Sequence, residues 1–241
     1  MADECNTLRF GPEVAAVYNP LIYAKKSYFK YLELAGTSVK KIIFVGMNPG
    51  PFGMAQTGVP FGEVAAVRDW LRINAAIGKP EHEHPKRPIE GFDCKRKEVS
   101  GRRLWGLFRE RFKTPGNFFN EHFVANYCPL VFMNETGANI TPDKLPAQEA
   151  APLFEICDRV LAQTIKLLQP QWVVGIGGFA KKKIDAVKEK YFTTEGTTQF
   201  TAAQILHPSP ANPKANAGWD REVTDTLTGL GIWQLFMSPE I

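Results

Sequence analysis

Cysteine is scarce in this chain, and no two cysteines lie close together. Only four occur in 241 residues, and they are Cys5, Cys94, Cys128 and Cys157. Zinc sites and iron–sulfur clusters usually contain at least one closely spaced cysteine pair, so this spacing argues against both. We therefore expect neither zinc nor an iron–sulfur cluster on these cysteines, and we expect Cys128 and Cys157 to be buried thiols.

Long apolar runs are also absent. No stretch approaches the roughly 18 residues that span a bilayer. The first sixteen residues are acidic and polar, without the basic and apolar parts of a secretory signal. These absences predict a protein that does not bind membranes and stays inside the cell, in the cytoplasm if it is bacterial or in the nucleus if it is eukaryotic. A G-x-S-x-G turn is missing too, which argues against a small-molecule α/β hydrolase.

The composition is that of an ordered globular protein. Apolar residues make up 44% of the chain and charged residues 22%. The length suits one domain over residues 1–241, with enough chain for one large core. The net charge of +4 permits binding to a polyanion but does not require it.

Short apolar runs alternate with helical periodicity. The runs, rich in Val, Ile and Phe, predict strands at residues 41–47, 123–127, 172–177 and 203–207. Spacings of three and four predict helices within residues 12–34, 63–73, 100–112, 148–168, 179–191 and 217–230. Residues 78–91 and 134–141 have the composition of loops. Continuous rather than alternating hydrophobicity indicates a parallel sheet covered on both faces, so the fold class is a doubly wound α/β sandwich.

Polar residues stand at the ends of three predicted strands. The first strand runs into Asn48, the second contains Asn126, and the fourth ends at His207. The carboxyl ends of parallel strands meet at one edge of the sheet, where ligands bind. We therefore expect these three side chains to line one cavity.

Each of the three side chains has a chemical interpretation and a structural one. The neutral amide of Asn48 can orient a water, or it can satisfy turn amides. The amide of Asn126 matches the O4 acceptor and N3–H donor of uracil, or it can bond to neighbouring backbone. His207 can stabilise negative charge on O2 of a departing pyrimidine, or it can be structural. The protonation state of His207 stays open.

Two loops could complete such a site. Phe61 lies between glycines and could stack on a base, although core packing is the default for phenylalanine. The polar loop after His207 could contact phosphates through Ser209, Asn212 and Lys214, or it could be a solvated connector. A His82-Glu83-His84 sequence could chelate a metal, but no third ligand is evident nearby.

The sequence resembles the single-strand-selective monofunctional uracil-DNA glycosylases. Residues 46–62 (GMNPGPFGMAQTGVPFG) look like the first motif of that family. The similarity covers about residues 15–235 and includes residues 17–24, 63–71, 84–88, 99–101, 124–130, 141–147 and 207–219. It implies a three-layer α/β/α sandwich with a short four-stranded parallel sheet. It also implies base-excision repair, in which uracil and 5-hydroxymethyluracil are flipped out and hydrolysed from single- and double-stranded DNA without strand cleavage.

The resemblance implies roles for particular residues. Asn48 would position water and His207 would stabilise the leaving base, with no metal and no cofactor. Asn126 would read uracil and Phe61 would stack on it. The remaining residues beside the base would be Met47, Gly50 and Met54, the last two near its C5 edge.

The loop after His207 departs from the family pattern. Its DNA-contacting residues would be Ser209, Pro210, Ala211, Asn212 and Lys214. The family usually has arginine at position 211, where it fills the gap left by the flipped base. Alanine is too short to fill that gap, so we expect activity to fall from single strands or mismatches to well-paired duplexes.

Two alternative functions remain. One is a mismatch-specific uracil/thymine glycosylase, which has a similar G-x-N-P-G motif but is disfavoured by the HPSP sequence. The other is a DNA- or nucleotide-binding module without catalysis. The expected partner is DNA in each glycosylase case, and we expect a monomer.

Overall fold

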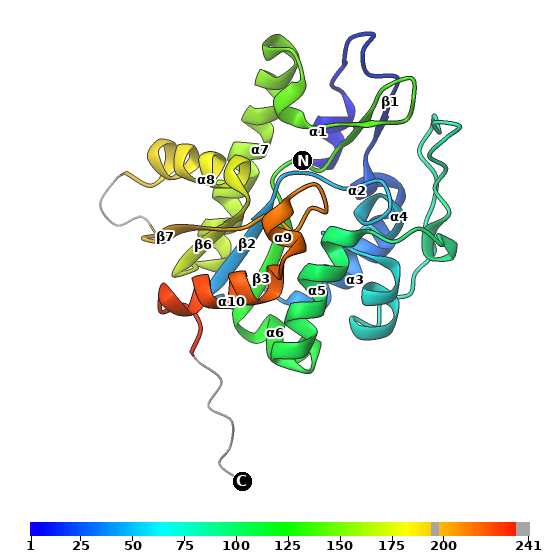
Figure 1. Ribbon diagram of the computed structural model, residues 1–241. Coiled ribbons are helices and arrows are strands. Elements are labelled where there is room, and N and C mark those ends of the chain that lie inside the picture. The colour runs from blue at the N-terminus through cyan, green and yellow to red at the C-terminus, as the bar shows by residue number, and fades with distance from the viewer. Residues whose placement is uncertain (194–197, 235–241) are drawn as a thin grey trace.

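A four-stranded parallel sheet forms the centre of the protein. The computed structural model describes residues 1–193 and 198–234 (Figure 1). The strand order is β3-β2-β6-β7, with neighbouring strands parallel. The strands are β2 (Ile42–Gly46), β3 (His122–Asn126), β6 (Trp172–Ile176) and β7 (Thr201–Ile205). The predicted four-stranded parallel sheet is confirmed, with strand ends shifted by one or two residues.

Two long helices cover one face of this sheet. They are α7 (Ala147–Leu168) and α8 (Gly178–Tyr191), seen at the upper left of Figure 1. Helix α8 packs closely on β6, because a Cβ at Gly175 would lie 2.5 Å from the backbone nitrogen of Lys181. Glycine at this position lets the chain turn directly from strand to helix against the sheet.

The other face is covered by helices rich in aromatic residues. They are α3 (Lys25–Ala35), α5 (Val99–Phe112), α6 (Pro115–Glu121) and α10 (Trp219–Gly229). Phe44 of β2 packs against Phe108 of α5, with ring centroids 5.1 Å apart. Tyr31 of α3 donates its hydroxyl hydrogen to the carbonyl of Val124 at 2.7 Å. Helices on both faces make the three-layer α/β/α sandwich that the sequence predicts.

A small antiparallel sheet was not expected. It consists of β1 (Ala16–Tyr18), β4 (Val131–Met133) and β5 (Asn139–Ile140). One or two helices were predicted within residues 12–34, with a break near Pro20. This prediction is wrong at its start, where β1 is followed by α2 (Pro20–Tyr23) and then α3. Pairing of Val17 with Phe132, far away in sequence, overrides the local periodicity. The loop predicted at 134–141 likewise contains β5.

Short helical turns fill the connections. They are α1 (Ala2–Asn6), α4 (Met54–Thr57), η1 (Ala66–Trp70), η2 (Gly91–Asp93), η3 (Pro142–Lys144) and α9 (Pro213–Asn216). The helix predicted over 63–73 is reduced to the wide turn η1, which closes with a bond from the Leu71 N–H to the Ala66 carbonyl. In the part of the chain that the structure describes, no helix is long and apolar enough to cross a bilayer.

Candidate active site

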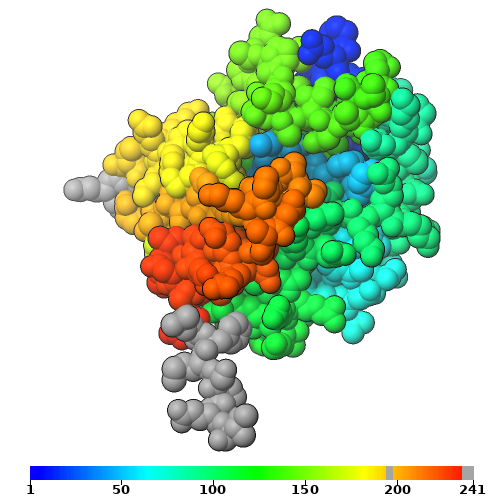
Figure 2. Space-filling model, viewed as in Figure 1, coloured from blue at the N-terminus to red at the C-terminus, as the bar shows by residue number. Residues whose placement is uncertain are grey.

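A cavity of about 350 Å³ lies at the carboxyl ends of the parallel strands. In Figure 2 the blue surface of the residues after β2 is recessed between the orange surface after β7 and the green surface above it. Asn48, Asn126 and His207 come from three separate strand ends and all line this cavity. The other lining residues are Met47, Pro49, Gly50, Pro51, Met54, Phe61, Glu98, Ser100, Asn139, Thr141 and Ser209.

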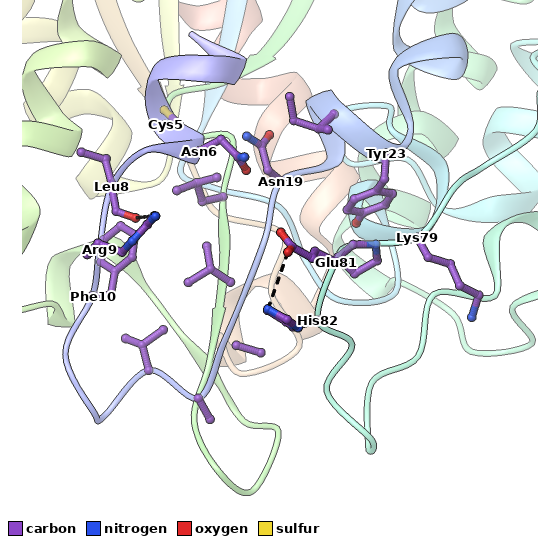
Figure 3. A pocket seen from close by; sticks show the side chains of 17 residues that line it. Cys5, Asn6, Leu8, Arg9, Phe10, Asn19, Tyr23, Lys79, Glu81 and His82 are labelled. Atoms are coloured by element: carbon purple, nitrogen blue, oxygen red, sulfur yellow. Dashed lines mark hydrogen bonds and ion pairs between the residues drawn. The ribbon is translucent and has the colours of Figure 1, made fainter.

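A larger cavity of about 620 Å³ lies elsewhere, between α1, β1, α2 and residues 79–82 (Figure 3). None of the sequence-predicted site residues lines it. The imidazole of His82 is 4.0 Å from the carboxylate of Glu81, its neighbour in the sequence, and both side chains are exposed. The Asn19 side chain lines it as well, and its Nδ2 donates to the Ala2 carbonyl, which ties α1 in place. The smaller cavity, where the strand ends converge, is therefore the candidate active site.

The side-chain amide of Asn48 is fixed by the backbone. Its Nδ2 donates to the carbonyl oxygen of Leu130 at 3.1 Å. Leu130 in turn follows β3, so this bond joins the loop after β2 to the segment after β3. This bond fixes the orientation of the amide, and its Oδ1, which can only accept hydrogen bonds, can position a water.

Asn126 is the last residue of β3 and lies beside Gly46 of β2. Its Nδ2 lies 3.3 Å from the sulfur of Met54. Its Oδ1 is buried and has no hydrogen-bond partner among the residues that the structure describes. A Cβ on Gly46 would lie 2.6 Å from Oδ1 and even closer to the ring of Phe61. Glycine at position 46 thus admits both side chains.

Phe61 adopts a backbone conformation that costs energy. Its φ is +54°, a value that costs a non-glycine residue about 1–2 kcal/mol. Hydrogen bonds hold it there: the Gly62 N–H donates to the Val59 carbonyl at 2.8 Å, and the Trp105 indole donates to Pro60 at 3.1 Å. Strain that the surrounding structure maintains in this way is typical of functional sites.

His207 is held as one neutral tautomer. The backbone N–H of Ser209 donates to its Nδ1 at 3.1 Å. Burial lowers the pKa of His207 below its ordinary value. A neutral ring that accepts at Nδ1 carries its proton on Nε2, so the remaining ring nitrogen is a hydrogen-bond donor.

Glu98 lines the cavity and was missed in the sequence. It precedes α5 as its N-cap residue, and its carboxyl group lies against Gly50 and Gly53. Burial raises the pKa of Glu98, and the backbone N–H groups of Phe52 and Ser100 act in the opposite direction. An acid directly before a helical run was the only available signal. The other lining residues that were not among the predicted site residues are Pro49, Pro51, Ser100, Asn139 and Thr141.

The loop after His207 is anchored by α5. Arg103 donates to the Pro208 carbonyl and to Oδ1 of Asn216, each at 2.9 Å. Asn216 closes the loop by donating to the Pro210 carbonyl at 2.8 Å. Ser209 lines the cavity, whereas the other predicted DNA-contact residues lie outside it. Of these, Pro210, Ala211 and Lys214 are exposed and Asn212 is half-buried.

The His82-Glu83-His84 segment has a structural role. His84 is buried and accepts a hydrogen bond from the Lys86 N–H at 3.1 Å, while His82 is exposed. Glu83 accepts from the Ile89 N–H at 2.7 Å and pairs with Lys79. Across residues 1–193 and 198–234, no three His, Cys, Asp or Glu side chains are grouped so that they could hold a metal ion.

The fold and this cavity define a class of protein that comparison with known proteins identifies. Residues 35–227 match the family model of the uracil DNA glycosylase superfamily, and the chain belongs to that superfamily. It is 42% identical over 236 residues to the single-strand selective monofunctional uracil DNA glycosylase of Bos taurus, covering 98% of this chain and 85% of the relative. It is 43% identical to the corresponding protein of Rattus norvegicus, covering 96% and 82%. The crystal structure of SMUG2 from Pedobacter heparinus has the same fold, with a TM-score of 0.66 at 16% identity, over 95% of this chain and 96% of the other.

Proposed function

We propose that this protein is a monofunctional DNA glycosylase that hydrolyses the bond between uracil and deoxyribose in DNA. The observation that carries the proposal is the buried Oδ1 of Asn126, which has no hydrogen-bond partner among the residues that the structure describes. A buried acceptor without a partner costs about 1–3 kcal/mol, so it binds well only a ligand that donates to it. The N3–H of uracil is such a donor. The relatives named as uracil-DNA glycosylases support the same substrate.

The mechanism follows from the groups around the cavity. Phe61 stacks on the flipped base and Asn126 reads its edge. Cleavage of the glycosidic bond leaves negative charge on O2 of uracil, and the Nε2–H of neutral His207 stabilises that charge where it develops. Water oriented by Oδ1 of Asn48 adds to C1′ of the sugar cation and releases a proton. The uracil anion takes up a proton directly or through solvent, so the products are neutral uracil and an abasic site. The amide of Asn48 is neutral and is a very weak base, so it contributes little general-base catalysis. Electrostatic stabilisation of the uracil anion therefore contributes most of the rate enhancement.

The pocket wall suggests substrates beyond uracil. Gly50, Met54 and Glu98 line the same cavity as Asn126. Glycine leaves room beside a pyrimidine, and the Glu98 carboxyl offers a polar group. We include 5-hydroxymethyluracil among the substrates for this reason, because its added group carries a hydroxyl that can hydrogen-bond.

Single strands and mismatches are the preferred substrates in this proposal. The curated relatives are named single-strand selective, and Ala211 supplies no long side chain to fill a gap in the duplex.

We further propose that residues 1–241 act as one domain and as a monomer. Since the substrate is DNA, we place the protein in the cytoplasm of a bacterium or the nucleus of a eukaryote.

Uracil release from single-stranded DNA tests the proposal. An end-labelled oligonucleotide with one uracil should remain intact after incubation and break at that position only after alkali. Asn48→Ala and His207→Ala should each abolish release while DNA binding persists. Binding without release by the wild-type protein would favour a module without catalysis, and thymine release from G·T duplexes would favour a mismatch-specific enzyme.

A further inference from the structure

A pair of arginines lies beside the candidate active site, and neither has a carboxylate partner in the described part of the chain. The guanidinium carbon of Arg96 is 4.1 Å from the ring centroid of Phe52, and that of Arg87 is 5.5 Å from it. Since these distances add to 9.6 Å, the two cations can be no further apart than that. No ion pair involves either arginine within residues 1–193 and 198–234. Phe52 directly follows Pro51, which lines the candidate active site.

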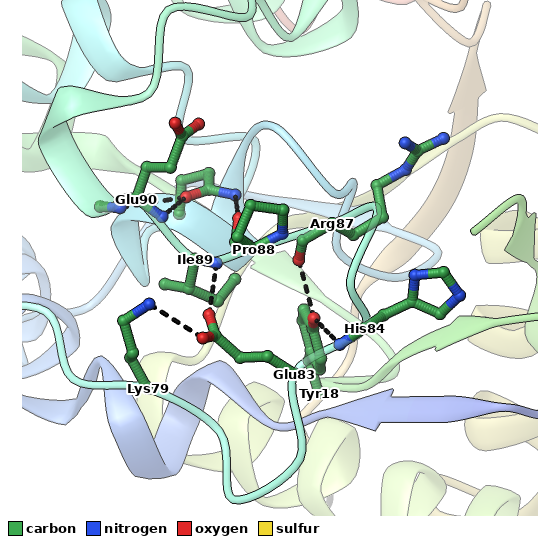
Figure 4. A network of polar contacts seen from close by, with 10 residues as sticks. Tyr18, Lys79, Glu83, His84, Arg87, Pro88, Ile89 and Glu90 are labelled. Atoms are coloured by element: carbon green, nitrogen blue, oxygen red, sulfur yellow. Dashed lines mark hydrogen bonds and ion pairs between the residues drawn. The ribbon is translucent and has the colours of Figure 1, made fainter.

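Arg87 is held by a rigid network (Figure 4). The Tyr18 hydroxyl donates to the Arg87 carbonyl at 2.7 Å and accepts from the His84 N–H at 2.7 Å. Glu83 joins Lys79 to the backbone of Ile89 in the same network. The guanidinium of Arg87 therefore projects from a fixed backbone, which reduces the entropy lost when it binds an anion.

Gln56 joins this segment to the loop that carries Asn48. Its Nε2 donates to the carbonyls of Pro51 at 3.0 Å and Pro88 at 3.2 Å. Its Oε1 accepts from the N–H groups of Glu90 at 2.8 Å and Gly91 at 3.0 Å. This buried side chain thereby fixes the arginine-bearing segment relative to the cavity.

Among the described residues, no acidic side chain pairs with either arginine. Glu98 is the acid nearest to Arg96 in sequence, and its carboxyl lies against Gly50 and Gly53. Glu83 is engaged by Lys79 and the Ile89 N–H. Arg96 is exposed, and Arg87 donates through Nη1 only to the neighbouring Lys86 carbonyl, at 2.8 Å. Guanidinium groups stacked on an aromatic face keep donor edges free, and those edges match phosphate oxygens.

We propose that Phe52, Arg87 and Arg96, together called the guanidinium platform, bind phosphates of the single-stranded DNA that flanks the uracil nucleotide. This proposal rests on the proposed function, because it needs a DNA strand that enters the cavity. Phe52 holds the two cations in place and the guanidinium edges contact the backbone. Contacts of this kind position the strand and carry no sequence preference.

Salt dependence of binding tests the platform. The probe is a single-stranded oligonucleotide with one 2′-fluoro-deoxyuridine, whose glycosidic bond resists cleavage. Each phosphate contact to a single strand contributes about 0.7 to the slope of log affinity against log salt. Arg87→Gln and Arg96→Gln should each weaken binding several-fold at low salt and make the slope shallower by about 0.7. Arg96→Lys, which keeps the charge, should restore the slope.

Lys190→Gln is the matched control. Lys190 also lies over an aromatic ring, with its Nζ 5.2 Å from the ring centroid of Tyr191. It is at the C-terminal end of α8, whereas the N-terminal end of that helix follows β6 at the cavity edge. This variant should leave affinity and slope unchanged. Oligonucleotides shortened from one side of the uracil should lose the effect of Arg96→Gln, and those shortened from the other side should keep it.

Unchanged slopes in both arginine variants, with wild-type melting temperatures, would overturn the platform. Equal losses for free uracil and for the oligonucleotide would also overturn it, because they would place the defect in the base pocket. Uracil release by the wild-type protein is a separate readout. If the wild-type protein releases uracil but the arginine variants show no change in slope, the proposed function stands and the guanidinium platform is refuted.

Discussion

The carboxyl group of Glu98 lies against Gly50 in the wall of the candidate active site. A Cβ on residue 50 would lie 2.8 Å from the carboxyl carbon of Glu98. A side chain at residue 50 would therefore require the end of the Glu98 side chain to move away from the loop after β2. This contact joins the loop that carries Asn48 to the residue that precedes α5.

Gly50→Ala should lower uracil release by about tenfold to a hundredfold, which corresponds to roughly 1.4–2.7 kcal/mol in the barrier. The added methyl group must displace Glu98 or the loop that carries Asn48. Single-turnover release rates on single-stranded DNA measure the effect. Glu98→Ala in the same chain should recover part of the loss, and a double-mutant cycle gives the coupling. Gly106→Ala, where a Cβ would meet nothing within 4 Å, should leave the rate unchanged.

Asn126→Ala should lower the activity of the protein without lowering its thermal stability. Loss of the uracil-reading amide should reduce kcat/KM by about 10- to 100-fold, as expected when 1–3 kcal/mol of hydrogen bonding is lost. The same change removes a buried acceptor that has no partner among the described residues. The melting temperature should therefore stay constant or rise. A large fall in melting temperature would show that Asn126 is structural.

The tautomer of His207 can be observed directly by 15N NMR. We expect Nε2 to be protonated and Nδ1 to be unprotonated, because Nδ1 accepts from the Ser209 N–H. Burial lowers the pKa of His207, so the neutral form should persist below the ordinary histidine value of about 6.5. Uracil release should hold constant as the pH falls past that value, and should decline only when Nδ1 takes up a proton and the bond to Ser209 breaks. A decline that tracks an ordinary histidine would contradict this expectation.

Ala211→Arg should raise activity on well-paired duplexes. A long cation at this exposed position can fill the gap left by the flipped base, and flipping from a paired duplex costs a few kcal/mol. We expect about a tenfold gain on a U·A duplex and less than about a twofold change on single strands, since an unpaired base costs least to flip. Ala211→Gln is the control for length without charge. A gain on single strands equal to that on duplexes would indicate phosphate binding instead.

His122 should make the protein sensitive to acid. Burial lowers the pKa of His122 to about 4. The neutral ring fits its surroundings: its Nδ1 lies 3.2 Å from the Phe118 carbonyl, and its Nε2 accepts from the Trp233 indole at 3.3 Å. A depressed histidine pKa stabilises the fold above about pH 6.5, and that contribution is lost as the pH falls towards 4, because the unfolded chain takes up the proton first.

The gap between these pKa values corresponds to about 3 kcal/mol of unfolding free energy. Urea unfolding of the wild-type protein at several pH values measures the loss. His122→Gln should be less stable near pH 7 but should show a shallower dependence on pH between 6.5 and 4. Parallel curves for the two proteins would assign the acid sensitivity to other groups.

The sequence by itself determined the parallel sheet and the edge at which the site lies. Continuous apolar runs predicted the ends of β2, β3, β6 and β7 to within one or two residues. Strands that are buried on both faces are apolar throughout, so they can be recognised in the sequence without knowing their partners. Asn48, Asn126 and His207 could be placed at one edge because the carboxyl ends of parallel strands meet there.

The tertiary structure decided the features that depend on pairing between distant segments. The segment from Ala16 to Tyr18 is a strand only because residues 131–133 lie beside it, and no local pattern shows that partner. Glu98 joins the site because α5 begins against Gly50, and the tautomer of His207 depends on where the Ser209 N–H points. Such contacts depend on three-dimensional positions set by the whole packed core, so hydrophobic periodicity along the chain does not encode them.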